Sequence, residues 1–228
     1  MPFTPEFDTD VEELTVAQIR EAGDIKRLER IREEFRQGFN LLADLGPAIC
    51  VFGSARIRTD SAEYEQGRYI GKLLAEQGFA VITGGGPGAM EAANRGAFES
   101  GGTSVGIGIE LPREQGINPY VNLSMNCHYF FTRKTMFMRY CDGLIVLPGG
   151  MGTLDELFEV QTLVQTHKSH SRAIVLFGTQ YWSGLINWLR DTVAVSGKVT
   201  SADLDRFILT DDPQEAVRIV TESAKVRH

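Results

Sequence analysis

Short apolar runs alternate with segments of helical periodicity along most of this chain. The apolar runs predict strands at Ala48–Phe52, Phe79–Thr83, Thr103–Ile109, Ser124–Phe130, Gly143–Val146, Arg172–Phe177 and Phe207–Thr210. The periodic segments between them predict helices at Ser61–Gln77, Ala89–Ala97, Thr132–Tyr140, Leu157–Val164, Tyr181–Val195 and Pro213–Lys225. Such alternation is typical of a parallel sheet with helices on both faces. The chain is therefore predicted to be an α/β protein, a Rossmann-like doubly wound parallel sheet.

A further helix is predicted ahead of the first strand. Within Asp24–Leu45, apolar residues recur at three- and four-residue steps and form one stripe, made of Ile25, Leu28, Ile31, Phe35, Phe39 and Leu42. This helix is expected to pack outside the sheet or against another subunit. Residues 1–23 look like a polar arm with a short helix over Val16–Glu21. We therefore divide the chain into an arm and extra N-terminal helix, 1–46, and a single nucleotide-binding catalytic domain, 47–228.

The composition narrows the class of protein. A chain of 228 residues with 43% hydrophobic residues is long enough for one large domain. Its net charge of −7 argues against general nucleic-acid binding, which favours a basic face. No uninterrupted apolar segment is long enough to span a membrane, and the first 13 residues lack a signal-peptide pattern. The three cysteines show no CxxC spacing, so we expect reduced, buried thiols and a cytoplasmic protein.

Three glycine-containing turns each follow a predicted strand. They are Gly53-Ser54-Ala55-Arg56, Gly84-Gly85-Gly86-Pro87-Gly88 and Pro148-Gly149-Gly150-Met151-Gly152-Thr153. Glycine lets the backbone approach a ligand closely, and the start of the following helix offers free N–H groups and partial positive charge. One such turn alone can be no more than a tight connection. Three at the carboxyl ends of parallel strands predict a phosphate-binding crevice at one edge of the sheet.

Several other kinds of site have no support in the sequence. There is no GxxxxGK[ST] motif for Mg-dependent hydrolysis of nucleoside triphosphates, no clean dinucleotide-binding fingerprint and no GxSxG elbow of a serine hydrolase. His128, His167 and His170 do not form a metal-ligand pattern. No metal site is expected.

Two clusters of charge are candidates for chemistry. Arg133-Lys134 lies near a predicted helix N-terminus, where cations oppose the helix dipole, and an anionic ligand would explain that placement. A solvated basic pair is the alternative. Asp155 and Glu156 are expected in the first turn of the helix after the third glycine turn, beside whatever that turn binds. Glu156 is the candidate catalytic carboxylate, although Thr153 and Glu156 also fit a capping box.

Taken together, these motifs resemble the LONELY GUY (LOG) family of cytokinin-activating phosphoribohydrolases. The resemblance rests on Pro148–Glu156, which fits PGGxGTxxE, on Arg133-Lys134, on Gly84–Met90 and on Pro112–Glu114. It covers about Ala48 to Val195, and many members carry the older label "possible lysine decarboxylase". The extra N-terminal helix is similar to the longer bacterial subgroup. The resemblance implies a homo-oligomer, a dimer or a hexamer.

The resemblance also implies an activity and roles for individual residues. The reaction is hydrolysis of the N-glycosidic bond of a nucleoside 5′-monophosphate, above all an N6-substituted adenosine monophosphate, to free base and ribose 5-phosphate, with no metal or organic cofactor. Glu156 and Arg133 match the family's catalytic residues. The other implied substrate- and phosphate-binding residues are Gly53, Ser54, Gly85, Gly86, Glu114, Lys134, Gly149, Gly150, Met151, Gly152, Thr153, Leu154, Asp155 and Thr162. Met151 and Asp155 stand where plant members frequently have Tyr and Glu.

Two other functions remain open at this stage. The chain could be a general AMP or purine nucleotide nucleosidase in salvage. It could also be a non-catalytic nucleotide-binding protein similar to molybdenum cofactor carriers, which share the glycine-rich fold, although the presence of both Arg133 and Glu156 argues against that.

Overall fold

The fold is built on a parallel sheet of seven strands. The computed structural model describes residues 16–111 and 116–225. The strands are β1 (Ala48–Phe52), β2 (Ala80–Thr83), β3 (Ser104–Ile109), β4 (Leu123–Cys127), β5 (Gly143–Val146), β6 (Ile174–Phe177) and β7 (Phe207–Thr210). Their order in the sheet is β4-β3-β2-β1-β5-β6-β7, and every neighbouring pair is parallel. The predicted α/β class and doubly wound sheet are confirmed.

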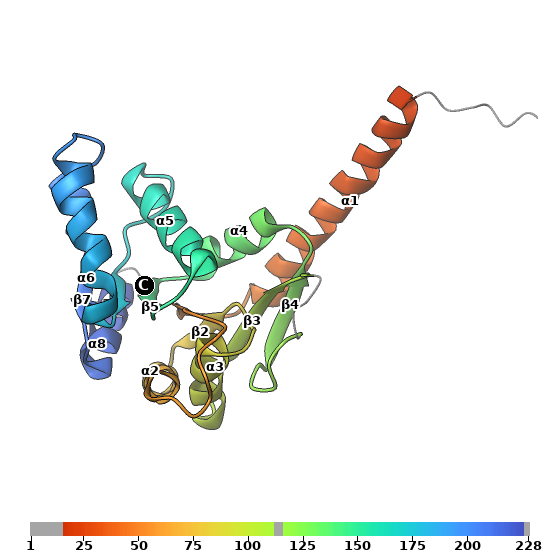
Figure 1. Ribbon diagram of the computed structural model, residues 1–228. Helices are drawn as coiled ribbons and strands as arrows, with labels where there is room; N and C mark the ends of the chain where they lie inside the picture. Colours follow the sequence, from red (N-terminus) through yellow and green to blue (C-terminus); the bar gives the residue numbers. More distant parts are fainter. Residues whose placement is uncertain (1–15, 112–115, 226–228) are drawn as a thin grey trace, which may run out of the picture.

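Helices cover both faces of this sheet (Figure 1). The helices are α1 (Val16–Leu42), α2 (Ala62–Glu76), α3 (Ala89–Glu99), α4 (Phe130–Tyr140), α5 (Met151–Gln165), α6 (Thr179–Trp188), the π-helix η1 (Leu189–Ala194), α7 (Ser201–Leu204) and α8 (Pro213–Lys225). Buried residues of α1, α4, α5 and α6 share one core, and those of α2, α3 and α8 share the other.

The alternation of side chains along each strand separates the two cores. In β1, Cys50 and Phe52 belong to the core under α4 and α5, whereas Ile49 and Val51 belong to the core under α2, α3 and α8. Phe52 meets the ring of Phe137 on α4 edge-on, with 5.1 Å between ring centroids. Since β1 is central and buried on both faces, its sequence is continuously apolar, as expected for a parallel strand.

Close packing of α2 against α3 requires glycine in both helices. A methyl group on Gly96 would collide with the backbone carbonyl oxygen of Arg68, and one on Gly71 would collide with that of Ala93. These two glycines cost helix propensity but let the backbones approach each other. The glycine turn after β2, which opens α3, is thereby set close to the sheet.

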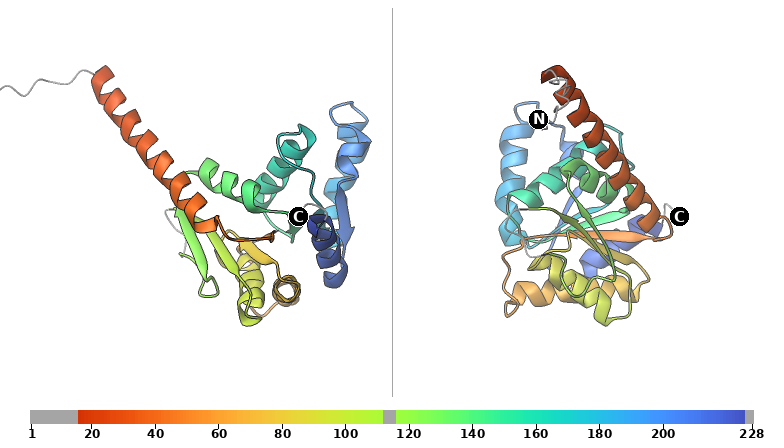
Figure 2. Two further views of the ribbon diagram at one scale, coloured as in Figure 1. Left: turned by 180° about the vertical axis from the view of Figure 1, so that it is seen from behind. Right: turned by 90° about the vertical axis from the view of Figure 1, so that its right-hand side faces the viewer.

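The extra N-terminal helix is longer than predicted. The expected arm helix and the stripe helix form one continuous helix, α1, because no proline separates them and the single intervening glycine, Gly23, lowers helix propensity by only about 1 kcal/mol. The N-terminal half of α1 projects away from the body of the molecule (Figures 1 and 2). Its stripe is therefore only partly covered, and Ile25 and Leu28 are exposed.

The chain reverses its direction of travel across the sheet between β1 and β5. From β1 it moves outward through β2, β3 and β4, and it then returns to place β5 on the other side of β1. At such a switch point the connections after the two strands diverge and leave a crevice at their carboxyl ends, which is where ligands bind in open α/β sheets. This topology places the Gly53 and Gly149 turns side by side.

Candidate active site

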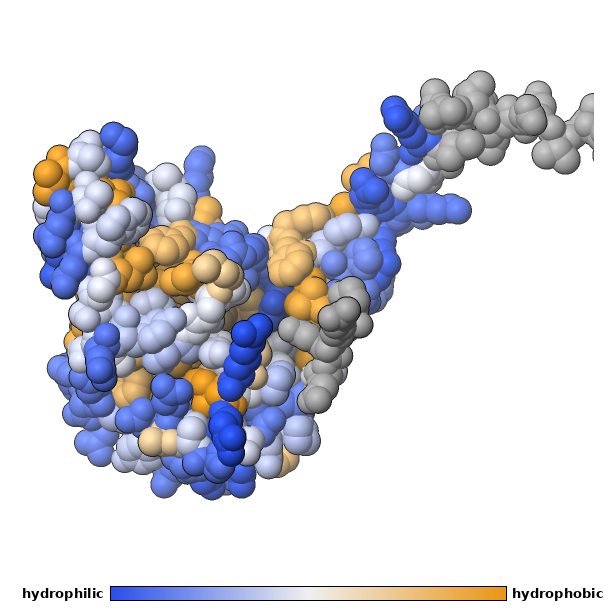
Figure 3. Space-filling model, in the orientation of Figure 1, coloured by the Kyte–Doolittle hydropathy of each residue, from blue (hydrophilic) through white to orange (hydrophobic). Residues whose placement is uncertain are grey.

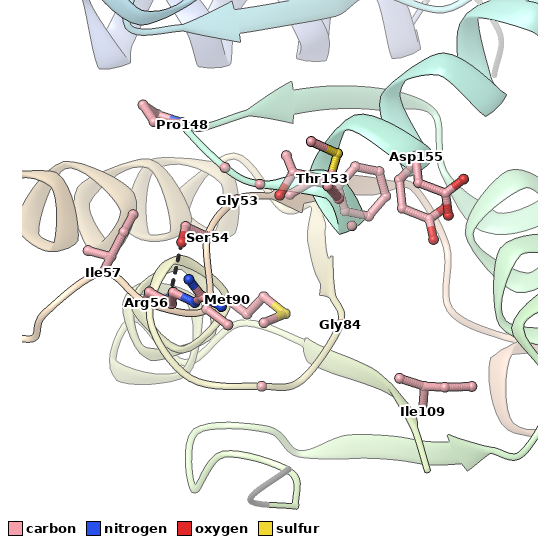
Figure 4. Close-up of a pocket in the computed structure, with 18 of the residues that line it drawn as sticks. Gly53, Ser54, Arg56, Ile57, Gly84, Met90, Ile109, Pro148, Thr153 and Asp155 are labelled. Atoms are coloured by element: carbon pink, nitrogen blue, oxygen red, sulfur yellow. Dashed lines mark hydrogen bonds between the residues drawn. The ribbon is translucent and has the colours of Figure 1, made fainter. Parts of the chain in front are cut away.

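A cavity of about 1070 Å³ opens at the carboxyl ends of β1 and β5 (Figure 4). This is slightly above the range of about 300–1,000 Å³ typical of small-molecule sites. All three glycine turns contribute to its wall, together with the start of α4. Its lining residues are Phe52, Gly53, Ser54, Ala55, Arg56, Ile57, Arg58, Ser61, Glu63, Gly84, Gly86, Met90, Ile109, Leu111, Phe130, Arg133, Phe137, Pro148, Gly149, Gly150, Met151, Gly152, Thr153, Asp155, Glu156 and Tyr181.

Backbone hydrogen bonds tie the turn after β1 to both of its neighbours. The N–H of Ser54 donates to the carbonyl of Pro148 at 3.0 Å, and the carbonyl of Ser54 accepts from the N–H of Ala89 at 2.9 Å. Gly53 has no room for a side chain, because a methyl group there would press on Ala89 and Leu147. The floor of the cavity is thus made of backbone, and hydrogen bonds join the turns that follow β1, β2 and β5.

The third glycine turn leads directly into α5. The helix begins at Met151 with Gly150 as its N-cap, and no side chain caps it. The free N–H groups and partial positive charge of this helix start therefore face the cavity, an arrangement suited to an anion. Tyr181 on α6, which also lines the cavity, holds the turn, since its hydroxyl donates to the carbonyl of Gly149 at 2.6 Å.

The helix start corrects two sequence-based expectations. Asp155 and Glu156 lie in the second turn of α5, not the first, and Thr153 and Glu156 do not form a capping box. The reason is that Gly150-Met151-Gly152 adopts the start of the helix, although its two glycines have low helix propensity. Glu156 is instead directed into the protein, where 6% of its surface is exposed.

The second glycine turn is shaped around Arg133. The Arg133 Nε donates to the carbonyl of Ile107 at 2.8 Å, and its guanidinium lies where a side chain on Gly84 would be. Gly85 adopts a positive φ of 73°, which favours glycine. From below, the buried Asn118 amide donates to the carbonyls of Gly85 and Gly86 at 3.0 and 3.1 Å. Gly85 therefore supports the turn, while Gly84 and Gly86 line the cavity.

Three carboxylates surround the amine of Lys134 on α4. Its Nζ lies 2.8 Å from Asp155, 3.2 Å from Glu156 and 2.5 Å from Glu159. Burial raises the pKa of Glu156, and the nearby charges of Lys134 and Arg133 oppose this rise without cancelling it. Burial alone would lower the pKa of Lys134, but contacts with Asp155 and Glu159 and the charge of Glu156 hold it above its ordinary value. Lys134 therefore helps to keep the buried Glu156 ionised.

The cavity presents both polar and apolar groups. Its polar groups are the glycine backbone, the start of α5 and, across the cavity from that helix start, the Arg56 guanidinium (Figure 4). Its apolar lining includes Met90, Ile109, Leu111 and Phe130. Figure 4 shows Thr153 and Asp155 on the α5 side and Ser54, Arg56 and Met90 across the cavity from them. Such a site can take a ligand that has an anionic end and a flat apolar end. The protein's own buried carboxylate, Glu156, lies in the wall beside the ligand.

Most of the residues expected at the site meet in this cavity. They are Gly53, Ser54, Gly86, Arg133, Gly149, Gly150, Met151, Gly152, Thr153, Asp155 and Glu156. Lys134 and Gly85 act from behind its wall. Leu154 and Thr162 lie on another face of α5, and the Thr162 hydroxyl donates to the carbonyl of Phe158. Glu114 lies outside the described residues.

Sequence reasoning missed Phe130 and Tyr181, and it named Arg56 only as the last residue of the first glycine turn, without a role in binding. Arg56 had a usable signal, because it follows the Gly53-Ser54 turn by two residues. Met90, the last residue of the Gly84–Met90 motif, also lines the cavity. Among residues 16–111 and 116–225, no cluster of three or more His, Cys, Asp or Glu side chains is arranged to hold a metal ion. Within the same ranges, no helix has the length and apolar character needed to cross a membrane.

Comparison with known proteins agrees with this geometry. Residues 90–220 match the family model described as "Possible lysine decarboxylase". A cytokinin riboside 5′-monophosphate phosphoribohydrolase of Mycobacterium marinum is 30% identical over 152 residues, which cover 65% of this chain and 80% of that protein. The enzyme of the same name from Mycobacterium tuberculosis is 30% identical over 68% of this chain and 83% of its own length.

Two solved structures share the fold. The structural genomics target TM1055 is 26% identical with a TM-score of 0.59, and the match covers 77% of this chain and 99% of that one. The Moco carrier protein of Chlamydomonas is 26% identical with a TM-score of 0.57, over 78% of this chain and 98% of that one. The family match spans more than half of this chain and includes α4 and the Pro148–Glu156 motif. The chain therefore belongs to the LONELY GUY (LOG) family, whose family model carries the description "Possible lysine decarboxylase".

Proposed function

We propose that this chain hydrolyses the N-glycosidic bond of adenosine 5′-monophosphates, including N6-substituted ones, and releases the free base and ribose 5-phosphate. The observation that carries the proposal is the buried Glu156 carboxylate, which lies in the cavity wall on the same helix whose uncapped start faces the cavity. The names of the two mycobacterial relatives support the same activity.

The 5′-phosphate is proposed to bind at the start of α5. Backbone N–H groups there are not capped by a side chain, and Gly149 to Thr153 line the cavity. Arg56 also lines the cavity and lies across from them (Figure 4). Six residues, about 9 Å of helix axis, separate Gly150 from Glu156. A phosphate held at Gly150 would therefore set the sugar beside Glu156.

Glu156 is proposed to act on the sugar. Cleavage of an N-glycosidic bond passes through a sugar with oxocarbenium character, as in the cleavage of O-glycosides. An ionised carboxylate next to that sugar stabilises its positive charge and orients or deprotonates the attacking water. Arg133 would either bind the phosphate or assist the departing base. The base itself would lie against Met90, Ile109 and Phe130.

Release of free base from AMP and from isopentenyl-AMP, followed by chromatography, tests the proposal. The wild-type protein is expected to release base from at least one of them. Preference for isopentenyl-AMP would indicate cytokinin activation, whereas equal or better use of AMP would indicate a salvage nucleosidase. Release from neither nucleotide would contradict the proposal and favour a binding protein like the Moco carrier, whose fold this chain shares.

We also propose that the protein is a cytoplasmic homo-oligomer, a dimer or a hexamer. Its three cysteines are free and buried, which fits a reducing compartment. Large apolar residues are exposed on α1, at Ile25 and Leu28, and beside the cavity, at Phe130, Phe131 and Met151. Figure 3 shows hydrophobic residues gathered over α4 and α5 and near the base of α1. Sedimentation equilibrium at micromolar concentration should give at least twice the 25.3 kDa of the chain, and a monomer would contradict this.

A further inference from the structure

A buried carboxylate of α1 contacts the start of α4. Glu34 is 7% exposed. Its two oxygens accept hydrogen bonds from the backbone N–H of His128 at 2.9 Å and from that of Tyr129 at 3.4 Å. Tyr129 is the N-cap residue of α4 and provides no side-chain cap, and the first turn of α4 contains no acidic residue. The anion that this helix start would otherwise lack is supplied by a residue more than 90 positions earlier in the chain.

A second set of contacts fixes the same junction. Arg30, one turn before Glu34 on α1, lies 3.7 Å from Glu34 and 3.0 Å from Glu110 at the end of β3. Glu110 in turn lies 2.8 Å from the Nδ1 of His128. Figure 2 shows the C-terminal part of α1 alongside β4 and the start of α4, and α1 packs against both elements. This part of α1 is therefore fastened to the start of α4 and to the end of β3, beside the cavity.

The two cations of the site stand one turn further along α4. Arg133 reaches the carbonyl of Ile107 and lies against Gly84, and Lys134 lies 3.2 Å from Glu156. Both side chains reach fixed partners on other elements, so a shift of α4 along its axis would break both sets of contacts. A displacement of about 1 Å in a site of this kind can cost on the order of a hundredfold in rate.

We propose that Glu34 is a positioning residue for the reaction, which holds the start of α4 so that Arg133 and Lys134 stand where Glu156 and the ligand need them. The inference rests on the proposed function. It gives α1, which lies outside the matched family region, a role in the active site besides any role between subunits. Glu34 does not line the cavity and touches no reacting atom.

The test compares Glu34→Ala and Glu34→Gln with Glu29→Gln, an exposed glutamate on the same helix. Base release is measured with AMP and isopentenyl-AMP, at temperatures where circular dichroism shows every variant folded. Glu34→Ala is expected to lose about tenfold in kcat, since a small shift of α4 weakens rather than removes the catalytic groups. KM should change less, because the turns after β1 and β5 keep their own hydrogen bonds. Glu34→Gln retains one acceptor oxygen and should recover part of the loss, and Glu29→Gln should behave as wild type.

The pH profile separates positioning from a general loss of stability. Glu156 faces Lys134 and Arg133 from α4, Asp155 and Glu159 from its own helix, and the Cys50 thiol from β1. If α4 carries Lys134 away, Glu156 becomes harder to ionise, so the acid limb of kcat should move to higher pH in Glu34→Ala. Removing the distant charge of Glu34 would by itself move the limb the other way. An unmoved limb or a wild-type kcat in Glu34→Ala would overturn the proposal.

The two proposals can fail separately. If the wild-type protein releases no base, the proposed function is wrong, and the position of α4 is then read from a ¹³C NMR titration of the Glu156 carboxyl. That titration should still move to higher pH in Glu34→Ala relative to Glu29→Gln. If it does not, the positioning role of Glu34 is wrong as well.

Discussion

Glu156→Gln is expected to lose base release by a factor of one hundred or more in kcat, with a smaller change in KM. The amide keeps the shape of the side chain but has neither the negative charge that stabilises an oxocarbenium-like sugar nor the basicity that activates water. Loss of a positioned acid–base group typically costs about 10²–10⁴-fold in rate. Binding should persist, because the start of α5 and the turn after β1 are unchanged. Single-turnover assays with AMP or isopentenyl-AMP measure the chemical step directly.

Glu159→Gln is the matched control. Glu159 belongs to the same helix and contacts the same Lys134 amine at 2.5 Å, but its side chain is 31% exposed and does not line the cavity. The same change of charge at Glu159 should reduce kcat by less than about tenfold. Loss of a positioned acid–base group would cost at least about a hundredfold. Equal losses in the two variants would mean that the carboxylate cluster matters only as a whole. A Glu156→Gln enzyme with wild-type kcat would remove Glu156 from the mechanism.

The central part of the sheet could be predicted from sequence because β1, β2, β3, β5 and β6 are buried along their whole length. β1, β5 and β7 begin and end where their apolar runs do, and the parallel pairing of the strands was predicted from their alternation with helices, whereas their order in the sheet was not predicted. The first residues of the helices could be predicted less well from the sequence. α5 begins within a glycine-rich motif that has the local character of a loop, and contacts distant in sequence stabilise it there, among them the hydrogen bond from Tyr181 to Gly149. Tertiary contacts outweighed local helix propensity.

The residues of the candidate site also fall into those that the sequence could predict and those that it could not. Residues in the turns that follow strands, such as Ser54 and Gly149, could be placed together because parallel strands end at one edge of the sheet. Phe130 and Tyr181 reach the cavity from helices whose rotation the sequence does not specify. Glu34 gives no local signal at all, because its partners His128 and Tyr129 lie more than 90 residues away. Residues that support a site from another layer of the fold become visible only in three dimensions.

Lys134→Met is expected to destabilise the protein at neutral pH and to move the acid limb of its activity to higher pH. The lysine side chain is 14% exposed and that of Glu156 is 8% exposed. Removing one partner of a largely buried ion pair typically costs about 3–5 kcal/mol, because the remaining charge stays buried without compensation. Three carboxylates would then share a site from which their common cation is gone. Thermal unfolding followed by circular dichroism measures the loss of stability.

In Lys134→Met, the pH dependence of activity and the pH dependence of stability both follow from the pKa of the Glu156 carboxyl. Burial already raises its pKa above the ordinary value of 4.5, and loss of Lys134 removes the main opposing influence, so the pKa in the folded protein rises further. Activity needs the ionised form and should therefore fail at a higher pH than in wild type. The free energy of unfolding should depend on pH in the opposite way, rising where the activity falls. The folded state binds the proton more tightly than the unfolded state, so the stability lost at neutral pH returns as the pH falls through the raised pKa toward 4.5.

Lys134→Arg keeps the positive charge and serves as control, with a pH profile closer to that of wild type. An acid limb that stays in place in Lys134→Met would mean that Lys134 does not govern the ionisation of Glu156.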